Sequence, residues 1–236
     1  MTILIEETFN CAICGKESEH KVIVSTNNLG GTSLDTRTFP AGYDILETFI
    51  QTCPSCGYCA PRISAKIEGT PEIIKTDSYR QQLKSTEFPS LANAFLCCSF
   101  IIDSNNEYTQ AGWQCLRAAW ACDDKGYHEP RFADAARKCR IQAITLLQKA
   151  KENGQSYGTD PGAEEALLVD LLRRTGQFEP ARMMCDEGLN KKPKKIIKDI
   201  LRFQQKLIDE SDLGMYTVDE AQKWARKNKV PKNTIG

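Results

Sequence analysis

The sequence has few of the residues and motifs on which most enzymes depend. It contains only two histidines, His20 and His128. It has no glycine-rich phosphate loop, no nucleophile elbow and no zinc-protease helix motif. Neighbouring carboxylates such as Asp123 and Asp124 stand at expected helix ends, where capping accounts for them. We therefore expect a protein that is not an enzyme.

Long apolar runs and a basic start are lacking as well. The longest apolar run, residues 94–102, is far shorter than the roughly 18 residues that a membrane span needs. The first ten residues carry two glutamates and no lysine or arginine, which does not resemble a secretory signal. Eleven cysteines in such a chain indicate a reducing compartment, where thiols serve as metal ligands or core residues. We expect a cytoplasmic protein without a membrane partner.

Charge is balanced overall but unevenly placed. Residues 189–236 carry 12 Lys/Arg against 6 Asp/Glu, with basic clusters at 191–195 and 224–233. Such clusters could contact the phosphates of a nucleic acid, and zinc ribbons often occur in nucleic-acid machinery. Residues 1–75, however, carry 9 Asp/Glu against 6 Lys/Arg. A solvated basic tail is therefore the favoured interpretation, and nucleic acid stays as a less favoured partner.

Two Cys-x-x-Cys-Gly motifs are the most specific feature of the sequence. They contain Cys11 and Cys14 in the first motif and Cys53 and Cys56 in the second. The spacing lets a tight turn bring two thiolates to one side. The glycine that follows has no Cβ, so the backbone can take a path on which a larger residue would clash. Two such turns supply four sulfurs at about 2.3 Å from one zinc ion. The sequence therefore predicts a structural Zn²⁺ site made of these four cysteines.

A redox dithiol and an iron–sulfur cluster are the two alternatives to a zinc site for the second motif. A redox dithiol normally sits at the start of a helix, and Gly57 and Pro61 discourage a helix directly after Cys56. An iron–sulfur cluster fits less well, because the run Cys53, Cys56, Cys59 lacks a matching fourth cysteine. We expect Cys59 to be a partly buried accessory thiol beside the site. The alternative is a thiol-based redox or metal sensor that uses all three sulfurs.

The periodicity predicts an α+β protein, in which a small β-rich ribbon precedes an all-α domain. Short strands are predicted at 21–26 and 43–52, joined through a turn at 27–31. We place domain boundaries so that the ribbon covers 1–75, the helical domain 76–212 and a basic tail with a short helix 213–236. Helices are expected at 88–105, 107–126, 130–153, 160–176, 179–189, 194–210 and 218–228.

The helical part contains two similar stretches. Residues 106–118 and 176–188 align without gaps, with alanine, cysteine and small residues at the same offsets. This pattern resembles the tetratricopeptide repeat, in which small residues let two antiparallel helices pack closely. The resemblance implies a surface for a protein or peptide partner, near which Tyr79, Tyr108, Trp113 and Trp120 are the aromatic candidates. The helical cysteines are expected to fill the core: Cys97, Cys98, Cys115, Cys122, Cys139 and Cys185.

Most of the chain resembles a group of uncharacterised bacterial domain-of-unknown-function proteins. In these, a zinc-ribbon-like N-terminal module precedes tetratricopeptide-like helices. The resemblance is carried by CAICG (11–15), SLDTR (33–37) and IQTCPSCGYCAP (50–61). It implies the same four metal ligands and a recurrent pair, Asp35 and Arg37, beside the ribbon. We interpret that pair as a brace for the hairpin rather than a binding site.

Overall fold

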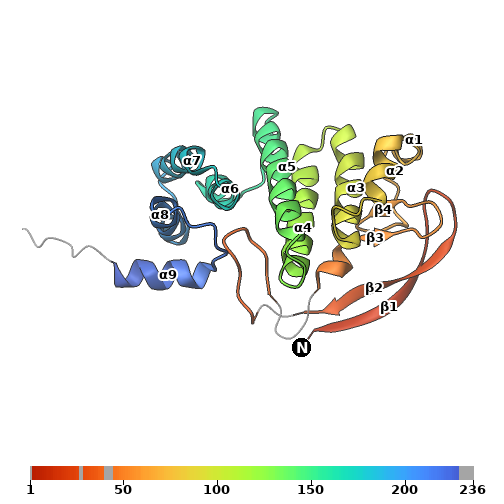
Figure 1. Cartoon of the computed structure of the whole chain (residues 1–236), viewed down its shortest axis with the longest axis horizontal. Coiled ribbons are helices and arrows are strands. Elements are labelled where there is room, and N and C mark those ends of the chain that lie inside the picture. The colour runs from red at the N-terminus through yellow and green to blue at the C-terminus, as the bar shows by residue number, and fades with distance from the viewer. Residues whose placement is uncertain (1, 27–28, 40–44, 229–236) are drawn as a thin grey trace, which may run out of the picture. The chain divides into compact units, whose positions relative to one another are not determined.

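The computed structural model describes residues 2–26, 29–39 and 45–228 (Figure 1). The chain divides into two compact units, one formed by Met1–Asn27 and Pro40–Tyr157, the other by Asn28–Phe39 and Gly158–Gly236. This division differs from the boundaries expected at 75/76 and 212/213. The residues from 76 to 157 belong to the same unit as the ribbon, whereas an early segment, 28–39, and the residues after 212 belong to the second unit.

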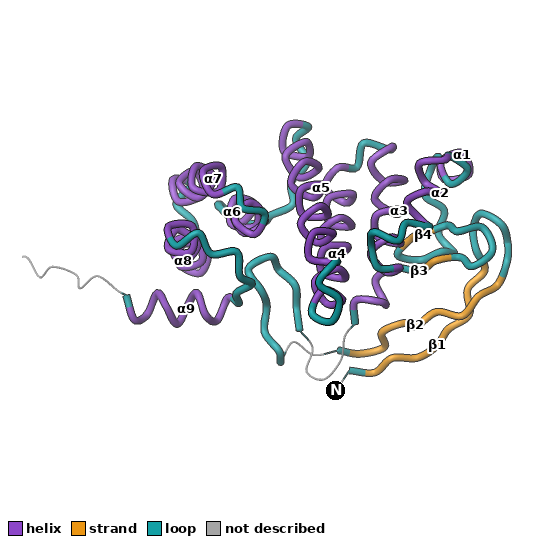
Figure 2. The backbone as a smooth tube through the Cα atoms, viewed as in Figure 1, coloured by secondary structure: helices purple, strands orange, loops and turns teal. Residues whose placement is uncertain are grey.

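The β part of the first unit consists of two separate antiparallel hairpins (Figure 2). Strands β1 (Ile3–Asn10) and β2 (Glu17–Ser25) pair along their length, and β3 (Gln51–Thr52) pairs with β4 (Cys59–Ala60). The predicted strand at 43–52 is largely wrong: in its described part, Leu46–Phe49 form a 3-10 helix before β3. The other predicted strand, 21–26, overlaps β2 and pairs with β1, because the turn after Asn10 folds the chain straight back.

Helices of the first unit follow the expected order, with α4 packed against both α3 and α5. Small buried residues make this close packing feasible: Ala111, Cys115, Ala118 and Cys122, which share one face of α4, are at most 2% exposed. A Cβ on Gly112 would lie 2.9 Å from the Leu147 side chain. The helices are α1 (Thr70–Ile73), α2 (Asp77–Leu83), α3 (Ser90–Ser104), α4 (Tyr108–Gly126) and α5 (Phe132–Glu152).

The second unit combines four helices with the segment 29–39. Leu34 donates its N–H to the carbonyl of Tyr216 at 2.9 Å and joins Phe203, Leu207 and Ala221 in one hydrophobic cluster. Residues beyond 212 are therefore packed as far as the structure describes them, rather than forming a tail. The helices are α6 (Ala163–Arg174), α7 (Phe178–Asn190), α8 (Lys195–Asp209) and α9 (Val218–Lys227). Helix α6 begins after Gly162, not at residue 160 where the predicted helix starts.

Two helical pairs, α3–α4 and α6–α7, turn in the same way. Each turn contains one residue with positive φ, Asn106 at 60° and Gly176 at 79°. In each turn the N–H of the third turn residue, Glu107 or Gln177, bonds back to the carbonyl five residues earlier. The predicted stretches at 106–118 and 176–188 thus share their local geometry, 70 residues apart.

Burial agrees with the core assignments made for the helical cysteines, all of which are at most 2% exposed. Of the four aromatic candidates for a surface, however, Tyr79, Tyr108 and Trp120 are buried. They serve the core, because their large apolar rings gain most from leaving water. No helix within the described residues is long and apolar enough to cross a membrane.

Candidate metal centre

Each Cys-x-x-Cys pair forms the turn of a hairpin. Cys11 and Cys14 lie between β1 and β2, and Cys53 and Cys56 lie between β3 and β4. In both turns the glycine after the second cysteine bonds back to the carbonyl of the first, at 2.8 Å and 2.9 Å. Gly15 and Gly57 have φ values of +72° and +76°, which glycine adopts more readily than other residues. The two turns therefore share one backbone form, as their common sequence predicts.

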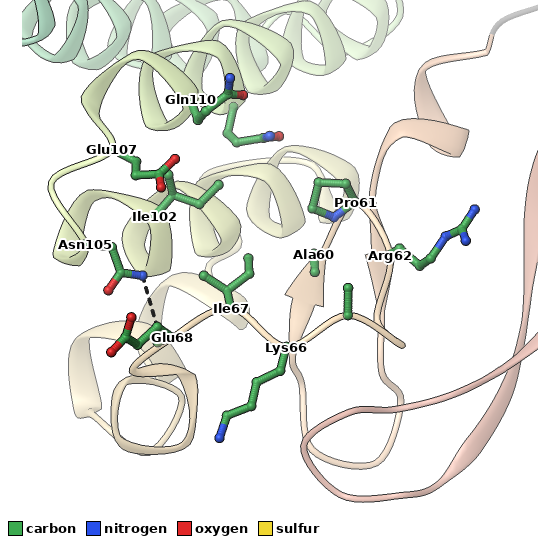
Figure 3. Close-up of a pocket in the computed structure, with 12 residues that line it drawn as sticks. Ala60, Pro61, Arg62, Lys66, Ile67, Glu68, Ile102, Asn105, Glu107 and Gln110 are labelled. Atoms are coloured by element: carbon green, nitrogen blue, oxygen red, sulfur yellow. Dashed lines mark hydrogen bonds between the residues drawn. The ribbon is translucent and has the colours of Figure 1, made fainter. Parts of the chain in front are cut away.

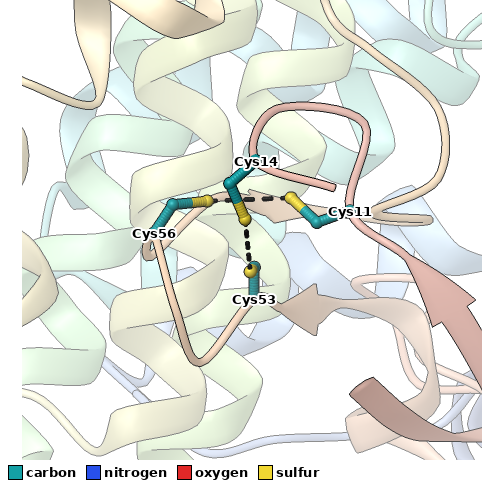
Figure 4. A group of neighbouring side chains, drawn as sticks. All are labelled: Cys11, Cys14, Cys53 and Cys56. Atoms are coloured by element: carbon teal, nitrogen blue, oxygen red, sulfur yellow. Dashed lines mark hydrogen bonds between the residues drawn. The ribbon is translucent and has the colours of Figure 1, made fainter. Parts of the chain in front are cut away.

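The four sulfurs converge on one point (Figure 4). Their Sγ atoms all lie within 4.8 Å of one another. The Cys11 and Cys56 sulfurs are 3.7 Å apart, and those of Cys14 and Cys53 are 3.6 Å apart. A tetrahedral site with metal–sulfur bonds of about 2.3 Å has sulfur–sulfur edges of about 3.8 Å. The cluster therefore has the size and donor set that suit a tetrathiolate metal ion.

Backbone N–H groups point at the sulfurs of Cys11, Cys14 and Cys56 and lower the pKa of each thiol. The N–H of Lys16 lowers the pKa of Cys14 to about 7. Burial acts in the other direction and raises the pKa of Cys11 and of Cys56, although backbone N–H groups partly oppose it in both. A divalent cation would supply the missing positive charge, since thiolates rather than thiols are the metal-binding form.

The second turn is held by helix α2. The Tyr79 hydroxyl donates to the carbonyl of Gly57 at 2.9 Å and accepts from the N–H of Cys59 at 3.2 Å. The Arg80 guanidinium donates to the carbonyl of Cys56 at 3.0 Å. Sequence reasoning missed both supports, because nothing in a tyrosine or an arginine more than 20 residues away marks it as a partner of the turn.

The first turn is held more lightly. Its backbone meets the body of the unit where the N–H of Ala12 donates to the carbonyl of Ile63 at 2.8 Å. Along β1, Phe9 is the one buried side chain, and the Arg62 guanidinium lies over its ring at 5.7 Å. His20 lies on β2, where its Nε2 is 2.9 Å from the Ser18 hydroxyl, and it is not a member of the metal-binding group.

Cys59 lies outside the four-sulfur group. It is fully buried in β4, with its sulfur 3.5 Å from the Thr52 hydroxyl and 3.5 Å from the carbonyl of Gly57. Interaction with the Cys97 thiol lowers the pKa of Cys59 against the opposing effect of burial. It is thus more deeply buried than the sequence suggested, and an oxidant in water has no direct access to it.

Asp35 and Arg37 belong to the second unit, not to the unit that holds the cysteines. The Asp35 carboxylate is 1% exposed and accepts from the Arg174 guanidinium at 3.0 Å, as well as from the Ser33 hydroxyl. The Arg37 guanidinium lies over the Phe39 ring at 5.2 Å. The carboxylate thus fastens segment 29–39 to helix α6, a contact between residues 139 positions apart.

The basic cluster at 191–195 makes ion pairs within the second unit. Lys191 lies 2.8 Å from the carboxylate of Glu165, Lys194 lies 2.6 Å from that of Asp160, and Lys195 pairs with Asp199. Of these partners, Glu165 lies on α6, Asp160 lies just before it, and Asp199 lies on α8 itself. Residues 229–233 of the second basic cluster lie outside the described residues.

Comparisons with known proteins leave the chain to be interpreted from its own residues. No protein-family model, no curated protein and no solved structure matches it. No family is therefore identified by comparison. What the structure itself provides is a small β region with a four-cysteine cluster, followed by packed helical pairs.

Proposed function

We propose that the protein is a zinc-stapled scaffold: a non-enzymatic adaptor whose helical pairs bind a protein partner. The observation that carries the proposal is the convergence of Cys11, Cys14, Cys53 and Cys56 within 4.8 Å. Zinc is the metal that this donor set suits best, because structural zinc sites are closed tetrahedra of sulfur and nitrogen ligands. Four thiolates leave no coordination position open for a substrate, which supports a structural rather than a catalytic ion.

The architecture of the β region explains why a metal is useful there. The two hairpins are separated by about 25 residues in sequence and form separate two-stranded sheets. An isolated two-stranded hairpin is marginally stable in water. Binding one ion joins the two turns, and the free energy of metal binding then becomes free energy of folding.

The adaptor part of the proposal is supported by the helical pairs. Stacked helical hairpins create extended surfaces and are commonly used for protein binding. The pairs α3–α4 and α6–α7 support the tetratricopeptide-like interpretation, because each is packed and Ala111 and Ala181 at the aligned position are both fully buried. We place the protein in the cytoplasm, where reduced thiols persist and zinc thiolate sites are common.

Metal content tests the staple directly. Purified protein should contain about one equivalent of zinc by mass spectrometry of the metal. Cys14→Ser and Cys53→Ser should each lose most of it. Cys185→Ser is the matched control, because its sulfur donates to the Leu201 carbonyl at 3.1 Å in the other unit and a serine hydroxyl can do the same. Less than about half an equivalent in the wild type would contradict the proposal.

A further inference from the structure

A pocket of about 570 Å³ lies in the first unit, apart from the four-sulfur cluster (Figure 3). One wall is the segment 60–68, which continues from strand β4, and the other is formed where α3 ends and α4 begins. Its volume falls in the range of about 300–1,000 Å³ that is usual for ligand sites. Nothing in the metal centre accounts for it.

A buried polar side chain in this pocket has one atom without a hydrogen-bond partner in the described structure. Gln114 lines the pocket and is 2% exposed, and its Oε1 has no hydrogen-bond partner in the described structure. Leaving a buried acceptor unsatisfied costs about 1–3 kcal/mol. A residue of this kind is readily explained when a ligand supplies the missing donor.

Other carboxamides extend the polar strip. Gln110 lines the same pocket one helical turn before Gln114, so the two side chains are about 6 Å apart on α4. Each carboxamide can donate and accept at once, which matches the N–H and C=O of a peptide main chain. Groups on one side of an extended peptide repeat every 6.6–6.8 Å or so, close to the spacing of the two glutamines.

The other lining residues favour a peptide over a nucleotide. The described lining residues include no aromatic ring on which a base could stack. Two basic residues, Arg62 and Lys66, also line the pocket, but Figure 3 shows their charged ends apart from the two glutamates. Glu68 and Glu107 would repel a phosphate from their own end. In Figure 3 these two glutamates lie at one end, where Asn105 donates to the carbonyl of Glu68 at 3.0 Å. That end suits a cationic group. Ile67 and Ile102 supply apolar surface between the polar groups.

We propose that this pocket binds a short extended segment of the partner protein, which pairs its main-chain amides with Gln110 and Gln114 and turns a lysine or arginine toward Glu68 and Glu107. The proposal deepens the adaptor function and rests on it. It assigns the partner contact to the junction between the ribbon and the first helical pair.

A random hexapeptide library displayed on phage is the probe. Selection against the full-length, zinc-loaded protein should enrich basic sequences, and the synthesised peptides should bind about tenfold more weakly to Gln114→Met. The same variant should keep or raise the thermal unfolding midpoint, because it removes an unsatisfied acceptor. A merely structural glutamine would lower that midpoint instead. Glu107→Gln should reduce the preference for basic over neutral peptides.

The control is Gln148→Met, the same chemical change at an exposed position on α5 that does not line the pocket. Enriched peptides that bind wild type and Gln114→Met equally would overturn the pocket assignment and leave the adaptor proposal standing. Failure to enrich any peptide, or tighter binding of adenosine or AMP than of peptides at Gln114, would overturn the peptide chemistry. Zinc content is measured separately, so the proposed structural zinc site is tested independently of the peptide pocket.

Discussion

The two cysteine turns have the same backbone and opposite surroundings. The turn at Cys11–Gly15 joins two strands that are largely exposed, and a Cβ on Gly15 would meet nothing within 4 Å. The turn at Cys53–Gly57 is embedded, with a Cβ on Gly57 only 2.6 Å from the Leu83 side chain. The sequence motif therefore determines the local shape of each turn. The elements packed around a turn determine how strongly its stability depends on the bound metal.

Metal removal should separate the two turns most clearly. Without the ion, the β1–β2 hairpin loses its link to the second turn, while the second turn keeps its bonds to Tyr79 and Arg80. We expect amide hydrogen exchange along β1 and β2 to accelerate by about a hundredfold or more, with a much smaller change at Cys53 and Cys59. Equal acceleration of amide exchange in both hairpins would show that the contacts with α2 are not sufficient to hold the second turn without the metal.

The paired glycines offer a matched substitution. Gly15→Ala should cost about 1–2 kcal/mol of unfolding free energy, because alanine is strained at positive φ. Gly57→Ala meets the same strain and also displaces Leu83, so we expect a total of about 3 kcal/mol or more. Denaturant unfolding of the two zinc-loaded variants measures the difference. A larger loss of unfolding free energy for Gly15→Ala than for Gly57→Ala would contradict the inference that the second turn is the more tightly packed.

Removing the Tyr79 hydroxyl should weaken the second turn alone. Tyr79→Phe leaves the carbonyl of Gly57 and the N–H of Cys59 without this partner in a buried setting, at a cost of about 1–3 kcal/mol. Tyr108→Phe is the control, since its hydroxyl bonds to the exposed Asn106 and its loss should cost less. Thermal unfolding of both variants compares them. An equal loss of stability in the two variants would contradict the inference that the Tyr79 hydroxyl holds the second turn.

Truncation of Arg80 is expected to have the smallest effect. Arg80→Met removes the donor to the Cys56 carbonyl but keeps most of the apolar stem of the side chain. A water molecule can then donate a hydrogen bond to that carbonyl instead. We expect a loss of about 0.5–1.5 kcal/mol and no change in zinc content. A variant that lost its zinc would instead make Arg80 part of what holds the ligand geometry.

The sequence alone predicts the elements that depend on local spacing. The four cysteines were recognisable because Cys-x-x-Cys-Gly specifies one kind of turn. The main helices, from residue 90 to residue 227, followed from apolar periodicity and small-residue stripes. The strand expected at 43–52 failed because its apolar residues serve a 3-10 helix, Leu46 being buried there. Apolar content alone does not distinguish those two outcomes.

Long-range pairings could not be predicted in this way. Asp35 was expected beside the ribbon together with Arg37, but its carboxylate meets Arg174 in the second unit. The partners of Tyr79 and the burial of Cys59 likewise depend on which helix passes over which turn. Such contacts are chosen by the packing of whole elements, for which a single sequence carries no spacing signal.

The insertion of segment 29–39 into the second unit has a consequence for synthesis on the ribosome. The segment leaves the ribosome early, yet Arg174 follows Asp35 by 139 residues and the Tyr216 carbonyl that receives the Leu34 N–H comes later still. At about 5–20 residues per second, Leu34 and Asp35 wait roughly 10 s or more for these partners. A nascent chain stalled near residue 160 should therefore be cut by protease within 29–39, and the released 236-residue chain should resist. The second unit can close only after Tyr216 has left the ribosome.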